Sequence, residues 1–228
     1  MNQTHGSGTH GSSSAGQAEA TTGRVIHSPR FYDALGFLMS FGREKRIRRT
    51  TMELAGVAAG QSVLDVGCGT GTLTLAAKAA VGPSGRVSGI DPAPEMVEFA
   101  RRKASRAGSD VDFRAGVVEA LPFSDATFDV VLSSLMLHHL PEDVKRKGFA
   151  EIARVLRPGG LFFAVDFATG SPGRLHGLVG RLFGHASGHT NHAELESAKQ
   201  MLAEAGFRDI MAGRMEFEFL VFLSGRRA

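Results

Sequence analysis

The chain of 228 residues contains one cysteine, one tyrosine and no tryptophan. A single cysteine excludes an internal disulfide and any site that needs several thiolates, so no metal site of that kind is expected. The longest apolar runs, such as LFFAV and FDVVL, are too short to span a bilayer. The polar N-terminus has no apolar core of the signal-peptide kind. By default, these absences lead us to expect a cytoplasmic protein.

The formal net charge of the chain is only +3. Basic residues are concentrated in two clusters, at residues 43–49 and 101–106. The second cluster lies on a predicted helix whose apolar stripe is elsewhere, which favours a solvated face over a nucleic-acid track. The first cluster follows an apolar stretch and could rest on a membrane surface or close over a pocket. We therefore expect no nucleic-acid partner and at most peripheral membrane contact.

Three regions differ in composition. Residues 1–24 are rich in Gly, Ser, Thr and His without an apolar period, which predicts a disordered tail. Residues 25–60 are predicted to form an N-terminal helical cap. Residues 61–228 are predicted to form one α/β domain, since 43% of the chain is hydrophobic and can supply a core. Gly, Pro, Ser and His interrupt this domain at about 170–190, where we predict a lid-like insertion.

Short apolar runs alternate with helical periods from Ser62 onward, which is typical of βαβ units. The pattern predicts a Rossmann-like, doubly wound sheet of seven strands, mostly parallel, with helices on both faces. A C-terminal antiparallel hairpin is predicted to complete it. The predicted strands are 62–66, 86–91, 111–116, 128–134, 161–167, 207–213 and 214–225, and the predicted helices are 71–81, 94–108, 141–156 and 191–205.

A glycine-rich turn, VLDVGCGTGTL, follows the first predicted strand, where ligands of such sheets bind. A dinucleotide fingerprint would place its third glycine at position 72, but the third glycine is Gly71, and no lysine follows as in a P-loop. Asp65, two residues before Gly67, would repel a phosphate and attract an ammonium group. S-adenosylmethionine carries an ammonium and a sulfonium and no phosphate, so it fits this turn.

Asp91 ends the second predicted strand, 20 residues after Gly71. An acid at this position can accept hydrogen bonds from both ribose hydroxyls of a bound cofactor. This fits NAD and S-adenosylmethionine equally well, so it supports the class of ligand without choosing within it. Asp91 could also cap the helix that follows.

Five segments occur in an order that resembles class I S-adenosylmethionine-dependent methyltransferases. They are VLDVGCGTGTLT, GIDPAPEMVEFAR, VEALPFSDATFDVV, HHL and EIARVLRPGG. The most similar branch is that of ubiquinone/menaquinone-biosynthesis-type C-methyltransferases and small-molecule methyltransferases of type 11. The resemblance covers about residues 31–160. It implies S-adenosyl-L-methionine as methyl donor, S-adenosyl-L-homocysteine as product, and a methyltransferase domain at 61–228.

The same resemblance implies which residues surround the cofactor. The acid and glycines of the turn would hold the methionyl part, Asp91 the ribose, Pro92 and Met96 the adenine, and two residues after the fourth strand would face the sulfonium. Tyr32 matches an aromatic that folds over the cofactor, although it could equally be a packing residue. The full set is Tyr32, Asp65, Gly67, Cys68, Gly69, Asp91, Pro92, Met96, Val117, Val118, Glu119, Ser134 and Leu135.

The chain departs from the family pattern where the family commonly has GDAEALPF and this chain has GVVEALPF. Val117 replaces the acid that contacts the adenine amino group. The backbone of Val118 or the side chain of Glu119 then becomes the candidate for that contact. Cys68, with no basic neighbour in the sequence, is expected to be a small tolerated residue rather than a nucleophile.

Methyl transfer requires an aligned nucleophile and, for some acceptors, a base. His138 and His139 follow the fourth predicted strand, and because adjacent side chains point differently, at most one is expected to face the pocket. We expect His138 to support the loop and His139 to be the candidate catalytic residue. Asp166 at the end of the fifth strand is the second candidate, with a cap or surface acid as its alternative. Three histidines near the C-terminal end, His185, His189 and His192, are expected to line a substrate entrance rather than to bind metal.

Sixteen phenylalanines against one tyrosine predict apolar pocket walls, and hence a small or lipophilic acceptor that is aromatic, polyketide-like, quinone-like or lipid-like. The usual motif of the quinone enzymes after the fourth strand is absent, so the acceptor and the O-, C- or N-position stay open. The alternatives are a cofactor-binding protein without transferase activity and an NAD-dependent oxidoreductase, which the glycine spacing disfavours. A monomer or a homodimer is expected.

Overall fold

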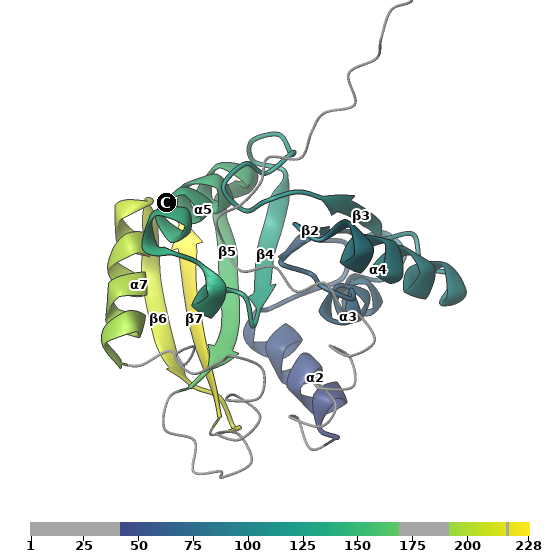
Figure 1. Cartoon of the computed structure of the whole chain (residues 1–228), viewed down its shortest axis with the longest axis horizontal. Coiled ribbons are helices and arrows are strands. Elements are labelled where there is room, and N and C mark those ends of the chain that lie inside the picture. Colours follow the sequence, from purple (N-terminus) through teal and green to yellow (C-terminus); the bar gives the residue numbers. More distant parts are fainter. Residues whose placement is uncertain (1–41, 169–191, 218) are drawn as a thin grey trace, which may run out of the picture.

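A computed structural model describes residues 42–168, 192–217 and 219–228 (Figure 1). Several sequence-based expectations therefore lie outside the described residues. These are the tail at 1–24, Tyr32 and the start of the helical cap, the insertion at 170–190, and the side chains of the three C-terminal histidines.

A seven-stranded sheet forms the centre of the molecule, in the order β3-β2-β1-β4-β5-β7-β6 (Figure 1). Its strands are β1 Ser62–Val66, β2 Arg86–Asp91, β3 Asp112–Ala115, β4 Phe128–Ser134, β5 Leu156–Phe167, β6 Phe207–Arg214 and β7 Leu220–Arg227. Strands β1 to β5 pair in parallel, and β7 lies antiparallel between β5 and β6. The predicted fold class is confirmed. The strand order reverses between β1 and β4, so the carboxyl ends of these strands are where a ligand is expected.

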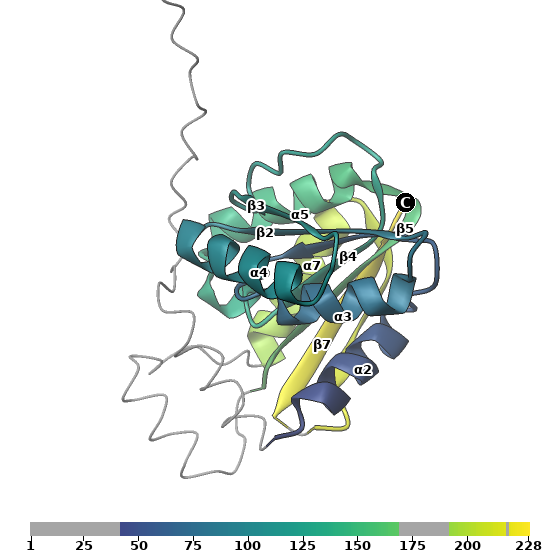
Figure 2. The same ribbon diagram turned by 90° about the vertical axis from the view of Figure 1, so that its right-hand side faces the viewer.

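Helices cover both faces of the sheet. They are α2 Glu44–Leu54, α3 Thr72–Val81, α4 Pro94–Arg106, α5 Glu142–Val155 and α7 His192–Glu204, with the short 3-10 helix η1 at Leu137–His139. Figure 2 shows α2, α3 and α4 in front of the strands. Residues of α5 and α7 belong to the core cluster on the opposite face.

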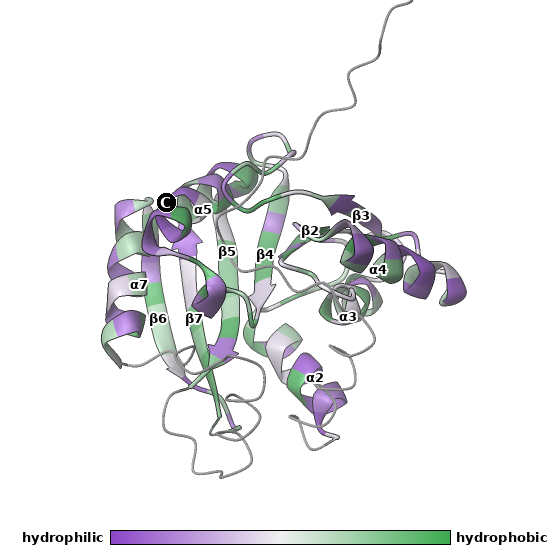
Figure 3. Cartoon of the chain, viewed as in Figure 1, coloured by the Kyte–Doolittle hydropathy of each residue, from purple (hydrophilic) through white to green (hydrophobic). Residues whose placement is uncertain are grey.

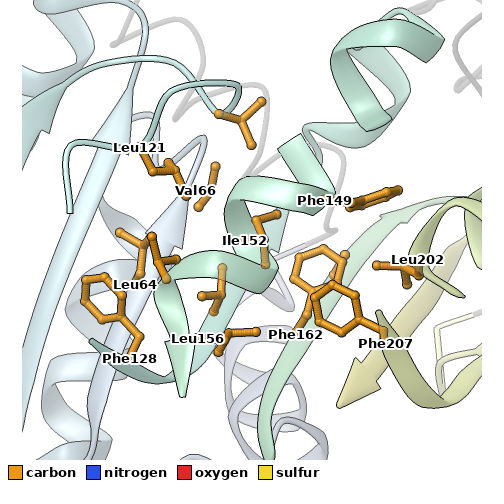
Figure 4. Packing of buried hydrophobic residues seen from close by; sticks show 14 of the residues in the cluster. Leu64, Val66, Leu121, Phe128, Phe149, Ile152, Leu156, Phe162, Leu202 and Phe207 are labelled. Carbon is orange, nitrogen blue, oxygen red and sulfur yellow. The ribbon is translucent and has the colours of Figure 1, made fainter. Parts of the chain in front are cut away.

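Alternation along the central strands divides the core between the two faces. In β1, Leu64 and Val66 pack with α5 and α7, whereas Val63 packs with α2 and α3. This is the period of two that a strand buried on both faces requires. Figure 4 shows Leu64 near Phe128 and Leu156, with Phe162 beside Phe207. The apolar colour of the central strands and the hydrophilic outer helix faces follow the same division (Figure 3).

The C-terminal hairpin differs from the prediction in its boundaries. The last strand begins at Leu220, so the predicted strand at 214–225 is wrong at its start. Met215 and Phe217 lie in the turn between β6 and β7, and both are buried. The turn closes through the Leu220 amide, which donates to the Phe217 carbonyl at 2.8 Å. Arg46 of α2 also binds Glu216 there, with Nη2 and Oε2 2.6 Å apart. A contact between distant segments therefore overrides the local alternation.

The boundary between α5 and β5 also differs, because α5 ends at Val155 and β5 begins directly at Leu156. The prediction had placed the start of this strand at Leu161, after the Pro-Gly-Gly segment. Leu156 pairs with Phe128, and the register shifts between Phe128 and Val130. The β-bulge accommodates the segment 158–160 within the strand.

Candidate functional site

The glycine-rich turn lies between β1 and α3. Its glycines have positive φ values, +72° at Gly67, +51° at Gly69 and +74° at Gly71, which a side chain rarely tolerates. The amides of Gly67 and Cys68 both donate to the Ile90 carbonyl, at 2.9 and 3.0 Å, and tie the turn to β2. The turn is therefore a fixed backbone surface at the carboxyl edge of the sheet.

Asp65 lies beneath this turn and is 1% exposed. Its Oδ2 accepts a hydrogen bond from the Thr74 hydroxyl at 2.6 Å. Its Oδ1 is buried and has no hydrogen-bond partner in the described part of the chain. Burial raises the pKa of this carboxyl to about 7, the Thr74 hydrogen bond opposes that rise, and the charge of Asp91 adds to it. A buried acceptor without a donor destabilises the protein, so this oxygen is suited to a ligand that donates.

Asp91, at the end of β2, accepts two backbone hydrogen bonds. Its Oδ2 accepts from the Gly69 amide at 2.8 Å, and its Oδ1 accepts from the Ala93 amide at 2.9 Å. Helix α4 begins at Pro94 with Ala93 as N-cap and no side-chain cap. The expectation that Asp91 caps this helix is therefore wrong, because its carboxylate holds the preceding turn. A carboxylate can accept several hydrogen bonds, so these two backbone contacts are compatible with a role of Asp91 toward ribose hydroxyls.

The predicted adenine region lies beside Asp91. The Gly116 amide donates to the Asp91 carbonyl at 3.1 Å, which brings the segment 116–119 to the end of β2. Pro92 is half-buried, and Met96, Val117 and Val118 are buried. The side chain of Val118 belongs to the core cluster that includes α5, so it is directed into the core.

Glu119 and Cys68 are two polar residues in this region with different surroundings. Glu119 has one buried oxygen, Oε2, without a hydrogen-bond partner in the described part of the chain. Cys68 packs with Val97, Ala100 and Phe113 in a small apolar cluster. Burial, followed by the charges of the neighbouring acids, raises the pKa of its thiol, so the thiol stays protonated and unreactive.

The ends of β4 and β5 form the other part of the site. Leu135 adopts a left-handed conformation, φ +55°, and its amide donates to the Val165 carbonyl at 2.8 Å. A non-glycine residue in this conformation is strained, which is common at functional sites. Ser134 and Leu135 are both half-buried at this edge. Met136 then packs on the glycine turn, because a Cβ added to Gly67 would lie 2.6 Å from its Cγ.

His138 and Asp166 form a buried pair across these strand ends. Their Nδ1 and Oδ1 atoms are 2.5 Å apart, and the two side chains are 3% and 7% exposed. Asp166 also accepts hydrogen bonds from the His138 amide at 3.0 Å and the Phe167 amide at 2.8 Å. Two backbone amides donate to Asp166, which favours a carboxylate that accepts from His138 as well. With Asp166 as the acceptor, Nδ1 of His138 is the donor and Nε2 is left as an acceptor.

Nε2 of His138 is buried and has no hydrogen-bond partner in the segments that the structure describes. The ring of His139 packs against that of His138, with centroids 3.8 Å apart. The sequence favoured His139 as the candidate catalytic residue, but the structure pairs His138 with Asp166.

Two further residues of the site, Thr74 and Met136, were not predicted from the sequence. The position of Thr74, in the first turn of the helix after the glycines, was a weak indication that it belongs to the site. Nothing in the sequence around Met136 indicated that its side chain packs on the glycine turn.

In the described segments, no group of three or more His, Cys, Asp or Glu side chains could hold a metal ion. No helix in these segments is long and apolar enough to cross a membrane.

A mostly parallel seven-stranded sheet with an antiparallel β7, together with an acid beneath the glycine turn, is typical of class I S-adenosylmethionine-dependent methyltransferases. Comparisons with known proteins agree. A family described as "Methyltransferase domain" matches residues 63–160. The chain is 32% identical over 209 residues to a ubiquinone/menaquinone biosynthesis C-methyltransferase of Cronobacter sakazakii, covering 82% of each chain. The protein belongs to the S-adenosylmethionine-dependent methyltransferase family that includes these C-methyltransferases.

A second relative of the same description, from Klebsiella pneumoniae, is 36% identical over 155 residues. That match covers 67% of this chain and spans 61% of the relative's length.

Solved structures share the fold. An S-adenosylmethionine-dependent methyltransferase from Aquifex aeolicus matches with a TM-score of 0.64 and 21% identity, covering 79% of this chain and 89% of that one. Geranyl diphosphate C-methyltransferase from Streptomyces coelicolor, in complex with Mg²⁺, geranyl diphosphate and S-adenosyl-L-homocysteine, matches with a TM-score of 0.65 and 16% identity. This match covers 81% of this chain and 79% of that one.

The family's cofactor is S-adenosylmethionine, and the residues present fit it. Oδ1 of Asp65, which has no partner in the described segments, matches an ammonium donor, and the sequence has no lysine at the P-loop position after the turn. Asp91 is fixed at the end of β2, where a ribose is expected.

Proposed function

We propose that this protein transfers a methyl group from S-adenosylmethionine to a small, apolar or aromatic acceptor that bears a hydroxyl or another acidic X–H group. The observation that carries this proposal is the buried His138–Asp166 pair, whose Nε2 has no donor in the described part of the chain. The pair lies at the same edge of the sheet as the glycine turn, because β1, β4 and β5 are parallel.

Asp65, Gly67, Gly69 and Asp91 would hold the cofactor, with Pro92, Met96 and the segment 117–119 near its adenine. The cofactor supplies, when bound, a methyl carbon activated by the positive sulfonium. The chain itself then has two tasks, to align the acceptor and to take its proton.

His138 is the group we assign to the second task. Asp166 holds the imidazole in the tautomer with a proton on Nδ1, so that Nε2 presents a lone pair. The acceptor's proton passes to Nε2, and the positive charge of the resulting imidazolium is balanced by Asp166. Asp166 is a positioning residue in this scheme, and Ser134 and Leu135 would form the wall near the reacting atom.

For the binding partners, the oligomeric state and the cellular compartment, our proposals are the same as the expectations from the sequence. We propose a small-molecule or lipophilic acceptor and no nucleic-acid partner, with at most peripheral membrane contact. A monomer or homodimer in the cytoplasm agrees with these proposals. The small-molecule names of the relatives support the first of them.

The test uses the full chain, S-adenosylmethionine and a panel of acceptors: phenols, naphthohydroquinones and aliphatic alcohols, each with a hydroxyl-free analogue. S-adenosylhomocysteine formation and the mass and position of the added methyl are measured. Methylation of hydroxyl-bearing acceptors alone would support the proposal. Turnover of the hydroxyl-free analogues at equal rates would contradict it.

His138→Gln and His139→Gln form a matched pair for assigning the base. Loss of a general base costs about 10²- to 10⁴-fold in turnover. We expect that loss for His138→Gln, with S-adenosylhomocysteine affinity retained. A larger loss for His139→Gln than for His138→Gln would reverse the assignment.

A further inference from the structure

Thr74 is fully buried in the first turn of α3, and its hydroxyl donates a hydrogen bond to Asp65. The 2.6 Å hydrogen bond occupies Oδ2 and leaves Oδ1 without a partner in the described segments. A carboxylate with one oxygen tied cannot rotate freely, so the hydroxyl determines which oxygen is presented to a ligand.

The surroundings of Asp65 disfavour its charge. From β2, the carboxylate of Asp91 adds negative charge, and from the glycine turn, Cys68 presents a neutral thiol. From α3, the hydroxyl of Thr74 donates, and it is the largest influence that favours the charged form. A cationic ligand is therefore the missing partner of this acid.

We propose that Thr74 is a positioning residue that aims Asp65 at the ammonium group of the cofactor, and that cofactor binding is coupled to the release of a proton from Asp65. This inference rests on the proposed function, because it takes S-adenosylmethionine and its product as the ligands.

The direction of the coupling follows from the pKa of Asp65, which burial raises to about 7 in the free protein. Above that pH the acid is ionised and ready to meet an ammonium, and below it a proton must leave first. S-adenosylhomocysteine should therefore bind about tenfold more weakly at about pH 6 than at about pH 7.5. Close to one proton should be released per molecule bound at the lower pH.

The experiment is titration calorimetry of the full chain with S-adenosylhomocysteine, in buffers of different ionisation enthalpy. 5′-Methylthioadenosine, which lacks the amino-acid part, is the control ligand. Its affinity should not change over this pH range, and its binding should release no proton from Asp65.

Thr74→Val keeps the shape of the side chain but removes the donor. We expect S-adenosylhomocysteine to bind about 10- to 100-fold more weakly, since a hydrogen bond to a charged group is lost. The midpoint of the pH dependence should move upward, because the largest influence that favours the charged form of Asp65 is gone. Thr74→Ser should restore both, and 5′-methylthioadenosine should bind all three proteins alike.

Asp65→Asn gives a second readout, since it keeps a side chain of the same size beside Thr74. It should bind S-adenosylhomocysteine weakly, without pH dependence or proton release. If Thr74→Val weakens both ligands equally, the role of Thr74 is structural and the inference fails. If S-adenosylhomocysteine binds the wild-type protein without proton release, the coupling is wrong while the proposed function stands. If it binds at no pH, the proposed function fails as well.

Discussion

The carboxyl edge of the sheet has two parts that are built in different ways. The cofactor half comprises residues 65–71 and 91–96 at the ends of β1 and β2. The acceptor half comprises residues 134–139 at the end of β4 and Asp166 at the end of β5. In the cofactor half, each acid accepts a hydrogen bond from a nearby residue of its own motif, Thr74 for Asp65 and Ala93 for Asp91. Asp91 also binds the Gly69 amide of the neighbouring turn. In the acceptor half, the decisive contact joins residues 28 positions apart.

Both halves present a buried acceptor atom without a donor in the described part of the chain, Oδ1 of Asp65 and Nε2 of His138. Such atoms destabilise a protein unless a ligand satisfies them. One atom suits an ammonium group and the other suits an acidic X–H group. Under the proposed function, the two ligands would be recognised by separate contacts, and each contact could be broken without the other.

The largest effect is expected from Asp166→Asn, which should disable the acceptor half alone. Without a carboxylate, the tautomer and the imidazolium of His138 lose their support, and turnover should fall about 10²- to 10⁴-fold. Calorimetry should give an unchanged affinity for S-adenosylhomocysteine. Nitrogen chemical shifts of the His138 ring should report the loss of the Nδ1-protonated form. A parallel loss of cofactor affinity would show that the halves are not independent.

A smaller effect is expected from Asp91→Ala, which should disable the cofactor half. The affinity for S-adenosylhomocysteine should fall about 10- to 100-fold, because hydrogen bonds to a charged group are lost. Gly69 also loses its acceptor, so the turn should loosen. Turnover at saturating cofactor should change much less than the affinity. An unchanged affinity would contradict the ribose role of Asp91.

The smallest effect concerns the contact between the two halves, where Met136 packs on Gly67. Gly67→Ala should destabilise the fold more than Gly82→Ala, as measured by urea unfolding. Both positions have similar φ values, +72° and +69°, but only Gly67 has a close neighbour, the Met136 Cγ at 2.6 Å from an added Cβ. Gly82→Ala should therefore cost only the backbone strain, about 1–3 kcal/mol, because its φ of +69° and ψ of −167° lie in a region that only glycine adopts readily.

The matched variant for this last prediction is Met136→Ala in the Gly67→Ala background. This substitution removes Cγ and Cε of Met136, which lie 2.6 and 3.9 Å from the added Cβ, and keeps only Cβ at 3.0 Å. It should therefore remove most of the steric cost and leave the backbone cost. Equal destabilisation by the two glycine variants would contradict close packing between the halves.

Most of the fold could be predicted because alternating apolar runs and helical periods report burial directly. Strands β1, β2 and β4 begin and end where the pattern placed them. The hairpin boundary could not be predicted, because Met215 and Phe217 continue the alternation of the strand but lie in a turn. Their burial depends on α2, which is far away in the sequence.

Like the fold, the candidate site has parts that the sequence predicted and parts that it did not. The turn with Asp65 and Asp91 was identified from residue types and spacing, and both acids lie at the predicted edge. The partner of Asp166 was not identified, because neighbouring histidines are equivalent in a sequence pattern. The left-handed conformation of Leu135 and the 3-10 turn after it orient them, and neither has a local signature.

Residue order alone thus determined the βαβ topology and the family, and it predicted the chemistry of the glycine turn, since periodicity and motif spacing act over short stretches of chain. Only the tertiary structure decided that Thr74 ties one oxygen of Asp65 and that His138, rather than His139, meets Asp166. Those choices depend on how strands and helices remote in sequence pack together, and on which polar atoms are left buried without a partner.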